Sequence, residues 1–106
     1  MAETETRQEL SLDEEMVCGL LGITLTNRER LRLLCEALHQ AIDIALTPRQ
    51  REIIRMYYFE QKRSVVIARE LRITPSSVSR TKKRAEGVLR RSLAFHFAYF
   101  HREIDP

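Results

Sequence analysis

Residues 67–78 read IARELRITPSSV, and the spacing of their apolar residues decides the fold. Two helices that cross at a tight angle need a small residue where they approach each other, and Ala68 supplies it. Their facing sides need apolar groups, which Ile67, Leu71 and Val78 provide, and Ile73 fills the turn between them. This is the spacing of a helix-turn-helix, whose second helix enters the major groove of DNA.

The second of these helices begins with a strong capping signal and then becomes polar and basic. Thr74 is a good N-cap, and Pro75 suits the first helical position because its missing N–H is not needed there. Hydroxyls and cations follow at Ser76, Ser77, Ser79, Arg80, Lys82, Lys83 and Arg84. Hydroxyl and Arg side chains can read base edges, whereas Lys and Arg neutralise phosphates. The alternative is an ordinary basic helix surface that faces solvent.

The basic side chains gather in one part of the chain. Residues 1–46 hold four basic and nine acidic side chains, a net charge of −5, whereas residues 47–106 hold fourteen and six, a net charge of +8. The overall charge of +3 hides this asymmetry. The basic part has the character of a polyanion-binding surface, with a charge-balanced solvated surface as the alternative.

Capping signals divide the rest of the chain into helices. Three of them have the S/T-x-x-E/Q spacing of a capping box, in which two side chains satisfy two backbone N–H groups. The predicted caps and helices are Ser11 for residues 12–21, Thr26 for about 27–45, Thr47 for about 49–60, and Ser64 for a short helix through Leu71. We expect Gly22 to end the first of these helices and residues 1–9 to form a frayed tail.

The last helix is expected to continue well beyond the basic segment. Val78, Ala85, Leu89 and Leu93 form its inner stripe. Aromatic side chains then fall on both faces, at Phe95, Phe97, Tyr99 and Phe100. They are too many for one short helix to bury against itself. They either pack back on the N-terminal helices or meet a second protein, and a second copy of this chain is one candidate.

Motifs of catalysis, metal binding and membrane insertion are not found in the sequence. Cys18 and Cys35 lie too far apart for a CxxC site, so we interpret them as small buried side chains. His39, His96 and His101 lack metal-ligand spacing, and no Gly-rich phosphate loop or nucleophile motif appears. The longest apolar run is about half a membrane span. We expect no enzyme activity, cofactor, metal or membrane contact, and a soluble cytoplasmic protein.

Three segments together resemble region 4 of the sigma-70 family, and in particular the small sigma-like helix-turn-helix regulators of bacteria, their phages and mobile elements. The segments are LTPRQREIIRMYYF at residues 46–59, IAREL at 67–71 and SVSRTKKRA at 77–85. The resemblance covers about residues 46–93. It implies a tri-helical module that reads promoter DNA and touches a flap of RNA polymerase.

The resemblance also implies roles for individual residues. Positions that face bases fall on Ser76, Ser79, Arg80 and Lys83. Backbone-contacting positions fall on Thr74, Ser77 and Arg84. We add three more cations as candidates for phosphate contacts: Lys82, Arg69 and Arg72.

The chain departs from the family pattern in four places. Arg72 stands where Gly is usual, so it must either adopt a left-handed conformation, which costs on the order of 1 kcal/mol, or shift the turn slightly. Val65 and Val66 replace acidic residues, and we expect the N-terminal helices to cover them. Lys82 stands at a position that is often apolar. Residues 1–46 show no likeness to sigma region 2, which a complete initiating sigma factor needs.

We therefore predict an all-α fold, a tri-helical helix-turn-helix domain with two extra N-terminal helices and an extended last helix. The predicted division is an acidic helical extension at residues 1–46 and the DNA-binding domain at 47–106. The predicted function is a sequence-specific transcription regulator that binds double-stranded DNA. Further candidate partners are RNA polymerase and a second copy of the chain, which would dimerise through the N-terminal helices or the C-terminal aromatic helix. The alternative is a protein-interaction module that binds RNA polymerase or a sigma factor and has little DNA affinity.

Overall fold

The part of the chain that the structure describes consists of helices that are connected by short loops. The structure is a computed structural model that describes residues 10–23 and 27–104, with side chains described as far as residue 95. The helices are α2 (Leu12–Leu21), α3 (Arg28–Ile44), α4 (Pro48–Ile54), the π-helical turn η1 (Arg55–Phe59), α5 (Ser64–Leu71) and α6 (Pro75–Ile104). The predicted all-α fold, with two helices before a helix-turn-helix and a long last helix, is confirmed.

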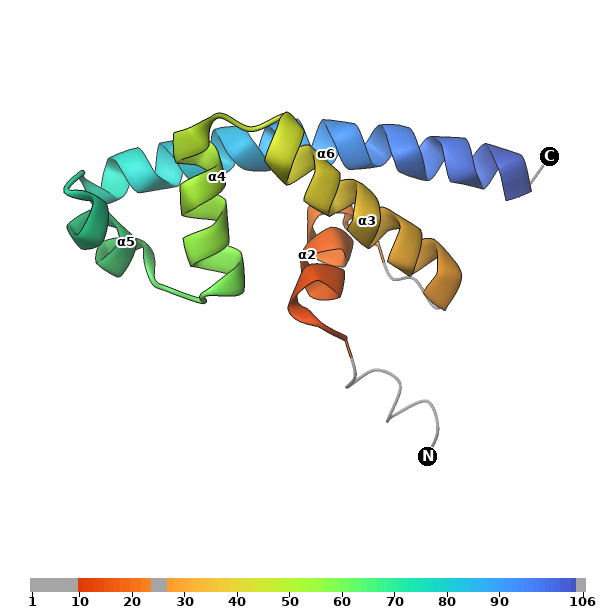
Figure 1. Ribbon diagram of the computed structural model, residues 1–106, viewed down its shortest axis with the longest axis horizontal. Coiled ribbons are helices and arrows are strands. Elements are labelled where there is room, and N and C mark those ends of the chain that lie inside the picture. Colours follow the sequence, from red (N-terminus) through yellow and green to blue (C-terminus); the bar gives the residue numbers. More distant parts are fainter. Residues whose placement is uncertain (1–9, 24–26, 105–106) are drawn as a thin grey trace.

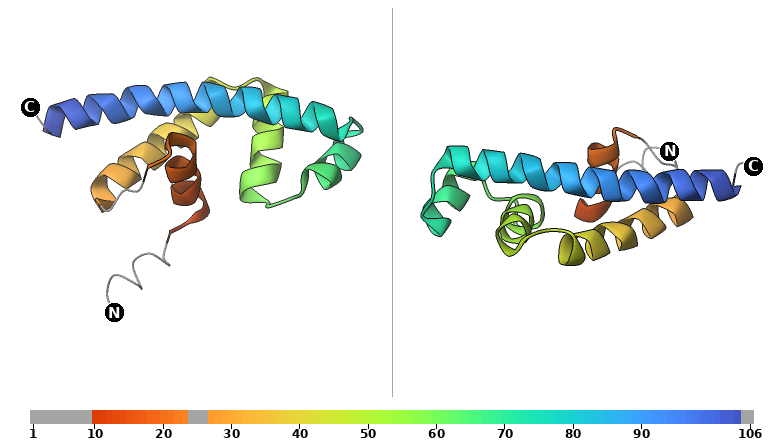
Figure 2. Two further views of the ribbon diagram at one scale, coloured as in Figure 1. Left: turned by 180° about the vertical axis from the view of Figure 1, so that it is seen from behind. Right: turned by 90° about the horizontal axis from the view of Figure 1, so that it is seen from above.

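Helix α6 is the spine of the molecule. Its 30 residues span about 45 Å at 1.5 Å per residue, close to the longest dimension of the molecule, 48 Å. Helices α4 and α5 lie against its N-terminal part, and α2 and α3 lie against its middle (Figure 1). The view from behind shows the same order along α6 (Figure 2). The first turns of α6 thus lie at the end of the molecule that is remote from α2 and α3.

Two capping boxes form where the sequence predicts them. Ser11 and Glu14 cap α2 reciprocally, and Thr47 and Gln50 do the same for α4, with Pro48 as the first helical residue. Each box satisfies backbone N–H groups that have no partner inside the helix. The predicted end of α2 is also confirmed, since its C-cap glycine is left-handed with φ +65°.

Two other predicted caps are wrong. Helix α3 is capped by Asn27, whose side chain accepts a hydrogen bond from the N–H of Arg30 at 3.1 Å. Asn is at least as good an N-cap as Thr, so the helix begins one residue later than a box from Thr26 requires. Ser64 is already the first residue of α5, because Arg63 has the extended backbone of an N-cap and makes no side-chain capping bond.

The apolar side chains form two clusters. The larger joins α2, α3 and the middle of α6 through Met16, Val17, Leu20, Leu31, Leu34, Leu38, Ile42, Leu46, Ile54, Ala85, Leu89 and Leu93. The smaller lies inside the helix-turn-helix and consists of Ile53, Met56, Ile67, Ala68 and Val78. The inner stripe predicted for α6 is confirmed, since all four of its side chains are fully buried. The larger cluster draws on both sides of residue 46, and the division there stays a prediction.

The aromatic residues of η1 connect the two clusters. The N–H of Glu60 donates to the carbonyl of Arg55 at 3.0 Å, five residues earlier, so the turn is wider than in an α-helix. This width lets three consecutive side chains all lie half-buried. Tyr57 packs on the smaller cluster, whereas Tyr58 and Phe59 pack on the larger. These three aromatic side chains are therefore partly buried against the two apolar clusters.

Several other expectations have clear outcomes. Cys35 is buried, Cys18 is half-buried, and His39 is an exposed helix residue. Val65 is 54% exposed, so the expectation that the N-terminal helices cover this position is wrong. The predicted tail at residues 1–9 and the side chains of Phe97, Tyr99 and Phe100 lie outside the described residues.

Candidate nucleic-acid interface

The turn between α5 and α6 has the geometry of a helix-turn-helix. Arg72 adopts φ +60° and ψ +45°, the left-handed conformation predicted for it. Its N–H donates to the carbonyl of Arg69 at 3.3 Å, and the N–H of Ile73 donates to that of Ala68 at 3.0 Å. These two bonds form a Schellman motif, which ends α5 and turns the chain sharply.

The small cluster fixes the two helices against each other. Ala68 is 3% exposed where α5 meets α6, and Ile67 and Val78 are fully buried on the facing sides. Leu71 and Ile73 are half-buried against the same cluster. The predicted roles of the small residue, the inner faces and the residue filling the turn are all confirmed.

Thr74 caps the N-terminus of α6. Its hydroxyl oxygen accepts from the N–H of Ser77 at 3.1 Å, and its carbonyl accepts from the N–H of Val78 at 3.1 Å. Pro75 is the first helical residue, as predicted. The helix therefore begins with a fixed register, and the direction of each following side chain is set.

The four residues predicted to face bases share one side of α6. Ser76, Ser79, Arg80 and Lys83 are all exposed. Helical periodicity places them within roughly 100° around the axis, opposite Val78 and Ala85. The Arg80 guanidinium lies 3.4 Å from the hydroxyl of Ser77, which can accept a hydrogen bond from it. We call this side of α6 the reading face.

Cations flank the reading face. Arg69, Arg72 and Arg84 are exposed, and within the side chains that the structure describes they have no ion-pair partner. Thr74 is exposed and Ser77 is half-buried beside them. Arg63, which the sequence reasoning did not single out, is also exposed at the start of α5. The sequence feature that could have identified Arg63 is that it is a cation directly before the first helix of the helix-turn-helix.

Lys82 is placed differently from the other predicted phosphate contacts. Its ammonium group lies 3.2 Å from the carboxylate of Glu86 and 4.3 Å from the centre of the Tyr57 ring. The side chains of Lys82 and Glu86 are only 20% and 15% exposed. The Tyr58 hydroxyl donates to the same carboxylate, and burial together with this bond raises the pKa of Tyr58. Lys82 is thus turned toward η1.

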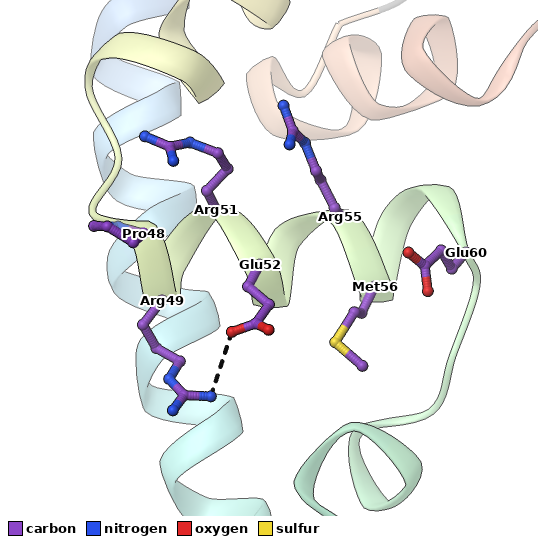
Figure 3. A pocket seen from close by; sticks show the side chains of 7 residues that line it. All are labelled: Pro48, Arg49, Arg51, Glu52, Arg55, Met56 and Glu60. Atoms are coloured by element: carbon purple, nitrogen blue, oxygen red, sulfur yellow. Dashed lines mark hydrogen bonds and ion pairs between the residues drawn. The ribbon is translucent and has the colours of Figure 1, made fainter. Parts of the chain in front are cut away.

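Three arginines of α4 and η1, Arg49, Arg51 and Arg55, form a second basic group that the sequence reasoning did not single out. They line an open groove of about 730 Å³ with Pro48, Glu52, Met56 and Glu60 (Figure 3). Arg51 donates to the carbonyls of Ile42, Asp43 and Leu46 at 3.0–3.2 Å. Arg55 lies 2.8 Å from the Asp43 carboxylate, and Arg49 pairs with Glu52. Arg51 and Arg55 thus join the end of α3 to α4 and η1, and Arg49 is paired within α4, so the groove offers few uncommitted cations.

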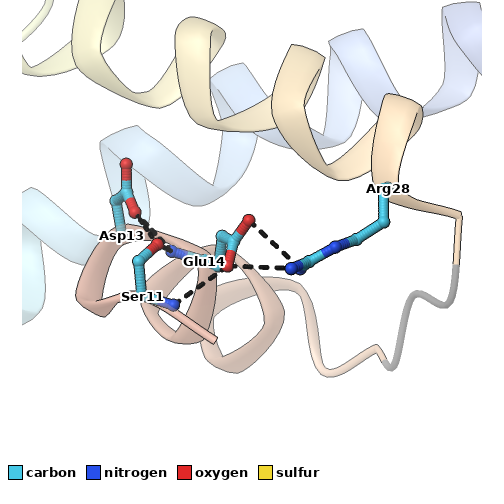
Figure 4. Close-up of polar contacts among 4 residues, drawn as sticks. All are labelled: Ser11, Asp13, Glu14 and Arg28. Carbon is cyan, nitrogen blue, oxygen red and sulfur yellow. Dashed lines mark hydrogen bonds and ion pairs between the residues drawn. The ribbon is translucent and has the colours of Figure 1, made fainter. Parts of the chain in front are cut away.

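Two acidic residues of α2, Asp13 and Glu14, are also engaged within the chain. Glu14 lies 3.4 Å from the Arg28 guanidinium and closes the capping box with Ser11, whose hydroxyl bonds to Asp13 (Figure 4). Asp13 lies 3.1 Å from His39. Burial raises the pKa of Asp13, but hydrogen bonds from Ser11, His39 and the Glu14 backbone outweigh it and hold the pKa below its ordinary value. This acidic surface therefore serves the packing of α2 on α3.

The described residues offer little for catalysis. Burial raises the pKa of the Cys35 thiol to about 12, so the sulfur stays protonated at neutral pH and is a poor nucleophile. Within residues 10–23 and 27–95, no three His, Cys, Asp or Glu side chains gather as a metal site. No helix of the described chain has the length and hydropathy needed to cross a membrane.

Comparison with known proteins identifies the region that contains the reading face. A family model described as Sigma-70, region 4, matches residues 35–87. The matched segment runs from the middle of α3 through α4, η1 and α5 to the fourth turn of α6. Searches of curated proteins and of solved structures gave no match.

Proposed function

Because this chain belongs to the sigma-70 region 4 family, we propose that it is a sequence-specific DNA-binding regulator of transcription. Sigma region 4 domains are non-enzymatic modules that bind DNA and RNA polymerase. The proposal goes further, since it assigns sequence recognition to the reading face of this chain.

The observation that carries the proposal is the exposure of the reading face on a rigidly held helix. Ser76, Ser79, Arg80 and Lys83 all face solvent, and the turn of α6 that bears them is fixed by the Thr74 cap and the buried Val78. A helix so exposed at one end of a molecule fits the major groove of B-DNA. Had these side chains packed beneath other helices, the proposal would have no basis.

Each residue of the interface receives a role from its chemistry. Arg80 is suited to donate two hydrogen bonds to guanine O6 and N7, and Lys83 to a neighbouring base acceptor. Ser76 and Ser79 read adjacent base edges. Phosphate contacts are assigned to Arg69, Arg72, Arg84, Thr74 and Ser77, because these side chains flank the reading face.

In vitro selection of bound duplexes from a random pool tests the proposal directly. We expect the full chain to enrich a short motif, because four exposed groups on one helix can contact only a few adjacent base pairs. Repeating the selection with RNA polymerase present shows whether polymerase extends or sharpens that motif. A pool that stays random in both selections would contradict sequence-specific binding.

A second candidate is a module that binds RNA polymerase or a sigma factor with little DNA affinity. The observation that favours it is Ile44, which is 82% exposed at the end of α3, beside a shallow groove lined by Ala37, Ala41, Ala45 and Ser92. Capture of purified polymerase by the chain, together with no duplex binding even at low salt, would favour this candidate over the first.

A further inference from the structure

One cation of the reading helix is held away from solvent by groups of the same chain. The Lys82 ammonium lies between the Glu86 carboxylate, at 3.2 Å, and the face of the Tyr57 ring, at 4.3 Å. The Tyr58 hydroxyl donates to the same carboxylate, which fixes its position. Tyr57 in turn meets Tyr58 edge-on, with 5.1 Å between the ring centres. We call Tyr57, Lys82 and Glu86 the clasp.

Lys82 lies close to the reading face by sequence. It is one turn beyond Ser79, and the two side chains are about 60° apart around the helix axis. Position 82 is therefore at the border between the reading face and the inner stripe that holds Val78 and Ala85. A lysine at this border has a long flexible stem, and without partners it could extend toward a phosphate beside the groove.

The clasp sets Lys82 apart from its neighbours. Lys83 and Arg84 are exposed and have no ion-pair partner among the described side chains, whereas Lys82 is only 20% exposed and has both a carboxylate and an aromatic face. An ion pair at this low exposure is screened less by salt than a surface pair is. A cation over a tyrosine ring gains a further attraction. If Lys82 exchanged these partners for a hydrated phosphate, the gain in free energy would therefore be small.

We propose that Glu86 and Tyr57 withhold Lys82 from DNA, and that they thereby set how many phosphate charges the reading helix neutralises. The inference rests on the proposed DNA-binding function. In it Glu86 is a positioning residue, because it acts on DNA affinity through Lys82 and does not touch DNA itself. The interaction limits affinity that does not depend on sequence and leaves recognition to the exposed side chains.

The number of neutralised phosphates can be measured from the salt dependence of binding. Each phosphate contact adds about 0.9 to the slope of log affinity against log salt concentration on B-DNA. We expect Glu86→Gln to steepen this slope by about 0.9 and to raise affinity for random-sequence duplex about fivefold near ~0.15 M salt. The glutamine keeps an acceptor for Tyr58 but loses the charge that holds Lys82.

Arg84 provides the matched comparison, because it is exposed on the same helix and is assigned to phosphate. Lys82→Gln should leave the slope of the wild-type chain unchanged, whereas Arg84→Gln should lower it by about 0.9. The double variant Glu86→Gln with Lys82→Gln should return to the wild-type slope. Glu36→Gln removes one carboxylate from an exposed pair on α3 and controls for net charge, so its slope should not change.

The outcomes separate this inference from the proposed function. A wild-type chain that binds no duplex at any salt concentration would contradict both the proposed function and this inference. A wild-type chain that binds, with Lys82→Gln lowering the slope as Arg84→Gln does, would overturn the clasp alone. A folded Glu86→Gln variant with an unchanged slope would overturn it as well. Thermal unfolding checks each fold, and Tyr57→Leu, which removes the aromatic partner, replaces Glu86→Gln if that variant does not fold.

Discussion

Arg80 is the side chain of the reading face with the most specific chemistry for bases. It is exposed, and its only hydrogen bond among the described contacts is the 3.4 Å approach to Ser77. We expect Arg80→Ala to cost ~1–3 kcal/mol at a selected site and to relax the preference at one base pair, because bidentate contact with guanine discriminates by that amount. Gel shifts on the selected duplex and its single-base variants measure both effects.

Arg84→Ala is the matched control for Arg80. Arg84 is an exposed arginine on the same helix, but we assign it to phosphate. Its loss should weaken binding to all duplexes alike and lower the slope of log affinity against log salt concentration by about 0.9. If both variants lose equal affinity on selected and random duplexes, the division into base-reading and phosphate-binding residues is wrong.

Arg72 combines two properties that one substitution separates. Its left-handed backbone, at φ +60°, costs on the order of 1 kcal/mol in a residue with a side chain. Arg72→Gly should therefore raise the free energy of unfolding by about 0.5–1 kcal/mol, while it lowers DNA affinity through the lost cation. Denaturant unfolding and a salt series measure the two effects separately.

Gln61 offers a control for the backbone effect alone. It is exposed, has φ +56°, and lies in the loop before α5, outside the proposed interface. Gln61→Gly should stabilise the chain by a similar amount and leave DNA affinity unchanged. Arg72→Lys, which keeps the charge and the strain, should change neither quantity much. A loss of stability in Arg72→Gly would contradict the assignment of strain to this residue.

At the scale of helices, Arg51 connects the N-terminal part of the chain to the helix-turn-helix. Its guanidinium donates to the carbonyls of Ile42 and Asp43 in the last turn of α3, which have no partner inside the helix, and to that of Leu46 in the loop before α4. We expect Arg51→Ala to lower the free energy of unfolding by about 2 kcal/mol, because three hydrogen bonds from a charged donor are lost and two of them are part-buried. Arg49→Ala, which breaks only an exposed pair with Glu52, should change stability by less than about 0.5 kcal/mol.

Denaturant unfolding of the two arginine variants distinguishes these roles. Equal stability of both would show that the carbonyls at the end of α3 are satisfied by water at no cost. A smaller loss in Arg51→Lys than in Arg51→Ala is expected, since lysine can reach one carbonyl but lacks the planar fork. Circular dichroism at low denaturant verifies that all three variants keep their helices.

The contacts that were predictable from sequence are those that lie close together along the chain. The boxes of Ser11 and Thr47, the end of α2 at Gly22 and the nesting of Ala68 each depend on a few neighbouring residues. The clasp and the Arg51 fork were not predictable, because they join residues from different elements. The caps at Thr26 and Ser64 failed for a local reason. An adjacent residue took the N-cap position, and sequence spacing alone does not choose between neighbours.

At the scale of the molecule, charge and packing divide the chain in different places. The acidic part ends near residue 46, and the basic part follows it. The larger apolar cluster crosses this point, because α2 and α3 bury Ala85, Leu89 and Leu93 in the middle of α6. The helices before residue 47 are therefore part of what supports the long reading helix, even though they lie far from its first turns.

This packing predicts that a fragment of residues 47–106 is less stable than the full chain. Leu89 is fully buried in the larger cluster, and Ile67 is fully buried in the smaller one. In the full chain, Leu89→Ala and Ile67→Ala should each cost ~2–5 kcal/mol.

In a fragment of residues 47–106, Leu89 has lost its partners from α2 and α3. We therefore expect Leu89→Ala to cost less than about 1 kcal/mol there, while Ile67→Ala keeps its full effect or unfolds the fragment. Denaturant unfolding of the six proteins measures the difference. Equal costs for Leu89→Ala in fragment and full chain would mean that residues 47–106 bury it themselves, and that the N-terminal helices are dispensable to the fold.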